Sequence, residues 1–170
     1  MTQVPDFVKE ARSSEVVHAG GDPQVGNLAT PINSSAFTRA FINNLPAYRS
    51  GLSAQRRGLE VGMAHGYLLY GPFAVLGPLR DSDVSGFAGA AAAILLVLIL
   101  TVCLSLYSSG GVKKPVSTIT NPNPPEALSS SEGWSEFAGG FLVGGIGGVI
   151  FAYLLLQVLD AGVFDVIGMG

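Results

Sequence analysis

Glu60 and His65 are the two residues of this chain whose types and surroundings could support ligand chemistry. From Glu60 to Arg80 the chain is almost wholly apolar, and His65 is the only acidic or basic side chain between them. An ionisable group inside a membrane-spanning segment is energetically costly and usually has a dedicated partner. Neutral imidazole is a good ligand for a metal with one open axial position, and a carboxylate oxygen suits magnesium. The two residues therefore predict two metal-binding positions.

The spacing of these residues indicates two separate partners. Five residues at roughly 100° each place Glu60 and His65 about 140° apart around a helix, too far to share one small metal ion. Gly58, Gly62 and Gly66 follow one strip of the same helix. We expect this strip to leave a flat backbone surface against which a planar ring rests.

Each of the two residues also has an interpretation that involves no metal. His65 would then donate a hydrogen bond to a backbone carbonyl or to a tyrosine of another helix. Glu60 would be an interfacial acid that pairs with Arg56 or Arg57 at the start of the helix, where a negative charge is favourable. The residue types and spacing leave both interpretations open.

Asp81 is a third candidate, in the charged turn from Arg80 to Asp83. In one interpretation the turn is solvated and Asp83 caps the helix that follows. In the other, Asp81 holds a bridging cation at a contact between subunits, because carboxylate oxygens are ligands that hard cations prefer.

The composition is that of an integral membrane protein. The 170 residues are 48% hydrophobic and only 12% charged, whereas a soluble domain has roughly 25% charged residues. The net charge of −3 and the absence of a large basic cluster argue against nucleic acid as a partner. The single cysteine, Cys103, cannot form an intramolecular disulfide. No Ser/His/Asp arrangement, cysteine pair or phosphate-binding loop is evident, so we expect no enzymatic activity.

Three long apolar stretches predict an all-α integral membrane protein with three transmembrane helices. A span needs roughly 20 residues, so the first helix must continue through Pro72 with a kink. An N-terminal extramembrane segment should contain a short surface helix over Ala36–Asn44, capped by Ser35, which lies on the membrane or packs on a partner subunit. The predicted segments are 1–57 (N-terminal segment), 58–79 (first span), 80–83 (turn), 84–107 (second span), 108–136 (polar loop), 137–159 (third span) and 160–170 (tail).

Glycines and cations indicate how the spans are packed and oriented. Gly140, Gly144 and Gly148 repeat every fourth residue and predict a groove that another helix approaches closely, which we expect to hold an oligomer together. Eight of the nine Lys and Arg residues lie in 1–57 and 108–136. The positive-inside rule places both segments on the cytoplasmic side and the C-terminus on the opposite side.

Four stretches are similar to the photosystem I reaction-centre subunit XI family, the L subunit. They are Asn43-Asn-Leu-Pro-Ala-Tyr-Arg49, Arg57-Gly-Leu-Glu-Val-Gly-Met-Ala-His-Gly-Tyr67, Gly77-Pro-Leu-Arg-Asp-Ser-Asp83 and Ser131-Glu-Gly-Trp134. The resemblance covers nearly the whole chain from about residue 22 onward. Residues 1–57 contain no evident signal peptide or organelle-import leader, which makes the chain resemble the cyanobacterial type.

This resemblance implies a non-catalytic subunit of photosystem I that binds antenna chlorophylls and carotenoids and mediates oligomerisation of photosystem I monomers. It implies that Glu60 and His65 are axial ligands to the magnesium of chlorophyll a, that β-carotene lies in grooves among the helices, and that a calcium ion at the subunit interface binds Asp81. The implied partners are other photosystem I core subunits, copies of the chain in neighbouring monomers and lipids. The implied location is the cyanobacterial thylakoid membrane, with the N-terminus cytoplasmic and the C-terminus lumenal.

The order of the oligomer is open. The polar loop contains Asn121-Pro-Asn-Pro-Pro125, which resembles versions found in tetrameric rather than trimeric photosystem I. Outside this family, the alternative function is a small ion or proton transporter subunit that uses His65 as a relay. A relay needs further ionisable groups facing His65, and the second and third spans contain none.

Overall fold

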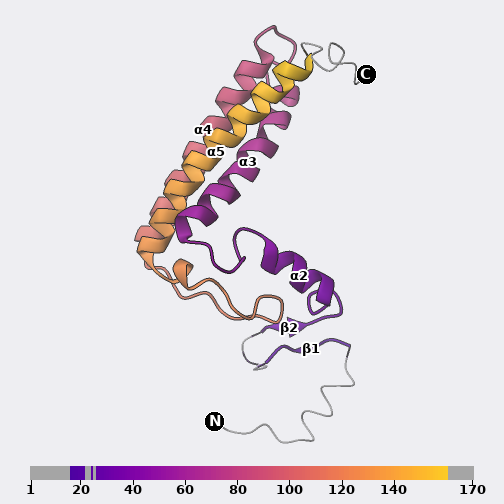
Figure 1. The fold of residues 1–170 in the computed structure, drawn as a ribbon, viewed down its shortest axis with the longest axis vertical. Helices are drawn as coiled ribbons and strands as arrows, with labels where there is room; N and C mark the ends of the chain where they lie inside the picture. Colours follow the sequence, from indigo (N-terminus) through magenta and orange to yellow (C-terminus); the bar gives the residue numbers. More distant parts are fainter. Residues whose placement is uncertain (1–15, 22–23, 25, 161–170) are drawn as a thin grey trace, which may run out of the picture. The chain divides into compact units, whose positions relative to one another are not determined.

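The computed structural model describes residues 16–21, 24 and 26–160, and the chain divides into two compact units. One unit is Met1–Ser50 with Pro115–Pro125, and the other is Gly51–Lys114 with Glu126–Gly170. Most of the predicted tail 160–170 lies outside the described residues, as do Lys9 and Arg12, which contribute to the predicted orientation. The elements are β1 (His18–Ala19), β2 (Leu28–Ala29), α2 (Ala36–Asn44), α3 (Ala54–Leu76), α4 (Ser85–Ser109), the 3-10 helix η2 (Glu126–Ser129) and α5 (Ser131–Asp160) (Figure 1).

The first unit contains the predicted short helix with its predicted bounds. The Ser35 hydroxyl accepts a hydrogen bond from the Thr38 amide at 3.1 Å, which satisfies one of the free amides at the start of α2. Phe37 and Phe41 are exposed and stack with ring centroids 6.3 Å apart. Before α2, β1 and β2 pair antiparallel with His18 opposite Ala29, a pairing that was not predicted from the sequence.

Residues 115–125 fold with the N-terminal segment instead of forming a separate exposed connection. The Thr120 hydroxyl donates to the carbonyl of Asn33 at 3.0 Å, and the side-chain amide of Asn43 donates to the carbonyl of Thr120 at 2.8 Å. Asn121 is buried, with 8% of its surface exposed. These long-range hydrogen bonds fix a Pro- and Asn-rich stretch that has no regular secondary structure of its own.

The second unit is built on α3, α4 and α5, which run side by side (Figure 1). α3 begins at Ala54, four residues before the predicted span, because the Ser53 hydroxyl accepts a hydrogen bond from the Arg56 amide and caps the helix there. The helix continues through Pro72, as predicted, and ends at Leu76. Its 23 residues span about 34 Å.

Two of the described helices, α4 and α5, are long and apolar enough to cross a membrane. Both extend beyond the predicted spans, and α5 includes the polar turn Ser131–Glu136 before its apolar run. α3 is not among these two, so the prediction of three membrane-spanning helices is not confirmed. The described chain is therefore mostly helical.

The start of α4 differs from the prediction that Asp83 caps it. The N-cap residue is Val84, with φ −102° and ψ 11°, and no side chain caps the helix. A capping side chain needs an extended backbone at the N-cap. Here the chain enters through successive turns, in which the Ser82 amide donates to Leu79 and the Ser85 amide donates to Ser82, so the Asp83 carboxylate is not at the capping position.

Glycines join α3 to α5 at backbone contact distance. A Cβ atom added at any of six glycines would overlap a backbone carbonyl of the facing helix. The pairs are Gly58 with Phe137, Gly62 with Phe141, Gly66 with Gly145, Gly140 with Gln55, Gly144 with Leu59, and Gly148 with Met63. Such contact is open only to residues without a side chain. We call these six glycines the glycine seam.

The glycine seam changes two predictions. Close helix packing through the Gly140, Gly144 and Gly148 row is confirmed, but the helix it contacts is α3 of the same chain. The strip formed by Gly58, Gly62 and Gly66 was expected to support a planar ring, and this expectation is wrong because α5 already occupies it.

α4 packs against both α3 and α5. Val97 is fully buried in a cluster with Phe137 and Phe141, and Ala93 is fully buried in a second cluster with Tyr70 and Val149. At the polar end of the bundle the buried Ser108 hydroxyl donates to the carbonyl of Ser131 at 2.9 Å and ties the end of α4 to the start of α5. The three helices thus form one packed framework for the candidate site.

Candidate functional site

His65 lies in the middle of α3 and has one of its two ring nitrogens engaged. Its Nδ1 is 2.7 Å from the carbonyl oxygen of Val61, one turn earlier in the helix. A carbonyl can only accept a hydrogen bond, so Nδ1 carries the proton in this contact. The proton on Nδ1 leaves the Nε2 lone pair of the neutral ring available. A metal-binding histidine is typically oriented in this way by a hydrogen bond from its other nitrogen.

The surroundings of the imidazole are consistent with an external ligand. The side chain is exposed on the helix bundle. One flank of the ring meets the edge of Phe141 from α5, with centroids 5.4 Å apart and an interplanar angle of 63°. Within the described part of the chain, Nε2 makes no hydrogen bond. The hydrogen bond to a carbonyl that was considered as an alternative to metal binding does form. It uses Nδ1, so Nε2 remains available to a metal.

Glu60 lies five residues before His65 on the same helix and is partly buried. Arg57, one turn earlier, is buried with 3% of its surface exposed. Residues three or four apart are neighbours on a helix surface, so Glu60 lies within reach of Arg56 and Arg57. The structure does not bring Glu60 and His65 together, and the two remain separate candidate positions on different flanks of α3.

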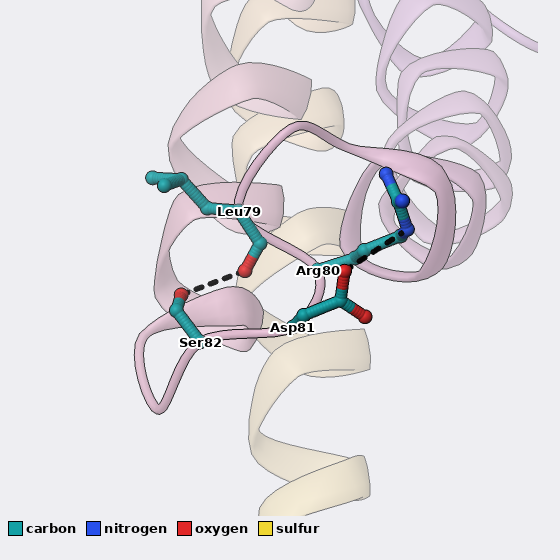
Figure 2. Close-up of polar contacts among 4 residues, drawn as sticks. All are labelled: Leu79, Arg80, Asp81 and Ser82. Atoms are coloured by element: carbon teal, nitrogen blue, oxygen red, sulfur yellow. Dashed lines mark hydrogen bonds and ion pairs between the residues drawn. The ribbon is translucent and has the colours of Figure 1, made fainter.

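Asp81 lies in the turn between α3 and α4 (Figure 2). Its Oδ2 is 3.5 Å from Nε of Arg80, and 85% of its side chain is exposed. The Ser82 hydroxyl donates to the carbonyl of Leu79 at 2.7 Å and closes the turn. Among the described residues, no group of three His, Cys, Asp or Glu side chains could hold a metal ion.

An apolar groove of about 500 Å³ follows the contact between α3 and α5. Gly144 and Gly148 belong to the glycine seam and form part of its floor, whereas a Cβ added at Gly147 would meet no atom within 4 Å. The groove is lined by Leu59, Met63, Ala64, Tyr67, Val143, Gly144, Gly147, Gly148 and Phe151. Its lining suits an apolar molecule.

Sequence reasoning found His65 but not the residues around it. The contact with Val61 was foreseeable, because a helical side chain reaches the carbonyl four residues earlier. The contact with Phe141 comes from a distant part of the chain and has no local signal. The glycine spacing indicates a closely packed helix pair. It does not indicate the apolar groove beside that pair.

The chain has many relatives of one kind. Residues 15–161 match the profile of the PsaL family, described as photosystem I reaction centre subunit XI. Proteins with the name "Photosystem I reaction center subunit XI" are similar over most of their length. One from Picosynechococcus sp. is 67% identical over 139 residues, 82% of this chain and 91% of the relative. One from Trichormus variabilis is 57% identical over 160 residues, which cover 91% of this chain and 93% of the relative. One from Mastigocladus laminosus is 55% identical over 165 residues, which cover 94% of this chain and 95% of the relative.

Proposed function

Because this chain belongs to the photosystem I reaction centre subunit XI family, we propose that it binds antenna chlorophylls and carotenoids and joins photosystem I monomers into oligomers. The chain is a structural, non-catalytic subunit of photosystem I in the thylakoid membrane, and other photosystem I core subunits are its partners. Membership of this family also implies associated pigments in general. The identity and position of those pigments are our proposal.

The geometry of His65 carries the proposal. Chlorophyll a would supply a light-absorbing ring whose central magnesium accepts one axial ligand. The Nδ1–H bond to the Val61 carbonyl holds the neutral tautomer that leaves Nε2 as the donor atom. The exposed position of the ring leaves room for a large ligand on the outside of the bundle. His65 therefore fits the role of an axial chlorophyll ligand.

Glu60 is the proposed second ligand. Its carboxylate lies near the start of α3 and on a different flank from His65, so a second chlorophyll a bound there would not compete for the same space. A carboxylate oxygen is a ligand that magnesium prefers, so the residue type suits this role.

The proposed topology uses all three long helices as membrane spans. α3 has sufficient length, with its charged first turns at the cytoplasmic surface and Glu60 near the interface. The N-terminal segment and the 108–136 loop are then cytoplasmic, and the 80–83 turn and the C-terminus are lumenal. In this orientation Asp81 faces the lumenal edge. With ligands from a neighbouring copy, its carboxylate would help to hold a calcium ion between monomers.

Oligomerisation is supported by the surface of α4. Several of its large apolar side chains face outward, with 60% of Leu95 and 67% of Leu106 exposed. Lipids or copies of the chain in neighbouring monomers would cover such a surface. The glycine seam is not available for this contact, because it is used within the chain.

The groove between α3 and α5 is the proposed site of β-carotene, and Gly147 provides a test. Replacing Gly147 by leucine should fill the groove without disturbing the helix pair, because the added side chain meets open space. We expect carotenoid bound per chain to fall at least several-fold, measured by extraction and chromatography. Gly139→Leu is the control, since Gly139 is equally open but lies outside the groove. Equal carotenoid content in the two variants would contradict the assignment.

An absorption spectrum tests the proposal as a whole. The full chain purified from native thylakoid membranes should carry chlorophyll and carotenoid bands, whereas the same chain from a host without pigments should not. A colourless product from the native membranes, folded as judged by circular dichroism, would count against pigment binding. No observation favours the transporter alternative, and the side chain whose ring contacts His65 is the apolar Phe141.

A further inference from the structure

Phe141 is a buried residue of α5 whose ring contacts the imidazole of His65 on α3. It has 4% of its surface exposed and meets the imidazole at a steep angle, with the two ring centroids 5.4 Å apart. Edge-to-face contact of this kind is a preferred geometry for aromatic rings. It is an aromatic contact between α5 and the ring of the proposed ligand.

The imidazole is thereby restrained at two places. The Nδ1–H bond to Val61 fixes one ring atom but leaves the ring able to tilt about that bond. The terminal torsion of histidine is broad, so the hydrogen bond alone does not set the ring plane. Phe141 closes one flank of the ring and limits the tilt. The direction of the Nε2 lone pair depends on both contacts.

We propose that Phe141 is a positioning residue that holds the His65 imidazole in the orientation needed for axial ligation of chlorophyll magnesium. This inference rests on the proposed function of His65. Phe141 acts through His65, and its role is to keep the donor nitrogen aimed at the outside of the bundle before the pigment binds.

The position of Phe141 is itself set by the glycine seam. Its carbonyl occupies the place where a side chain on Gly62 would lie, so α5 sits at backbone contact with α3 three residues before His65. The Phe141 ring is packed in a cluster with Val97 and Phe137. A residue held this firmly can transmit the geometry of the helix pair to the imidazole.

Phe137 provides a matched control. It lies one turn before Phe141 on α5, is buried with 6% of its surface exposed, belongs to the same cluster, and has its carbonyl against Gly58. Its ring contacts Trp134, with centroids 5.3 Å apart, and makes no aromatic contact with His65. Phe137→Leu therefore removes a similar volume from the same core without touching the proposed ligand.

The first readout uses the full-length chain in detergent micelles without pigment. The chain has two histidines, so ¹⁵N-histidine labelling gives few signals, and His65→Leu identifies the one from His65. We expect a single neutral Nδ1–H tautomer for the wild type and for Phe137→Leu. In Phe141→Leu the signal should broaden or divide between tautomers. Phe141→Met, which keeps more volume but no ring, should give the same result and separates the effect from a folding defect.

The second readout is the rate of pigment loss after loading with chlorophyll a. Loss of the His65-dependent absorption band to detergent should be roughly threefold to tenfold faster in Phe141→Leu than in Phe137→Leu, as expected from the strength of one aromatic contact. If both histidine signals and loss rates of the two variants agree, the positioning role of Phe141 is overturned while the ligand role of His65 stands. If His65→Leu retains its full chlorophyll content, the proposed function itself fails.

Discussion

Replacing Gly144 by leucine is expected to separate α3 from α5 and to unfold the bundle. The carbonyl of Leu59 lies where the first side-chain atom would be, and backbone cannot move aside as a flexible side chain can. Overpacking a tight core by this amount destabilises by about 3 kcal/mol or more. The thermal unfolding midpoint in detergent, followed by circular dichroism, should fall sharply, and the chain should accumulate poorly in membranes.

Gly139→Leu is the control for this experiment. It makes the same chemical change on the same helix, and a Cβ at Gly139 meets no atom within 4 Å. Its unfolding midpoint should stay within a few degrees of the wild type. If Gly144→Leu were as stable as Gly139→Leu, α3 and α5 could not be in backbone contact. The experiment also separates two roles of the glycine row, because a row used only between monomers would leave the isolated chain stable.

Replacing His65 by leucine is expected to remove one chlorophyll per chain and to leave the fold intact. The side chain is exposed, and its one hydrogen bond is to a carbonyl of its own helix, which still accepts from the backbone amide of residue 65. Leucine is also comfortable on a lipid-facing surface. Chlorophyll content per chain should therefore fall while the unfolding midpoint, measured on the same sample, stays unchanged.

His18→Leu is the matched control, since it removes the only other histidine of the chain. His18 lies in β1 of the first unit and is not part of the proposed site. We expect its chlorophyll content to equal that of the wild type. Unchanged chlorophyll stoichiometry in His65→Leu would contradict the ligand assignment, and a fall in both variants would point to a general loss of assembly.

Local signals in the sequence predicted α2 and the passage of α3 through Pro72, but not β1, β2 or the first residues of α3 and α5. Ser35 indicated where α2 begins, because a capping residue acts on the first turn of its helix. The helix through Pro72 followed from membrane thickness, since a helix that stopped there would be too short to cross. Asp83 failed as a cap because the backbone conformation of a turn is set by several residues together.

Contacts between distant segments could not be predicted in the same way. The four-residue glycine spacing indicates a close approach but does not name the partner, and here both glycine rows face each other within one chain. α4 is apolar on all sides, so its pattern gives no information about which face is buried. The fold of residues 115–125 with the N-terminal segment depends on hydrogen bonds of Thr120 and Asn43 across a long stretch of chain.

At the candidate site, too, local features could be predicted from the sequence and contacts between distant segments could not. The type and depth of His65 made it a candidate ligand, since an ionisable group in an apolar helix needs a partner. The contact with Val61 follows from helix geometry alone, whereas the contact with Phe141 requires the folded structure. Residues that select a ligand atom can be read from a sequence, whereas residues that aim it come from packing.

A density map of the intact photosystem I complex that resolves pigment rings would test the central claim most directly. We expect a macrocycle whose magnesium lies within coordination distance of Nε2 of His65, with Nδ1 still hydrogen-bonded to the carbonyl of Val61 and Phe141 against the imidazole. A map in which Nε2 donates or accepts a hydrogen bond to protein, with no macrocycle beside α3 at this position, would contradict it.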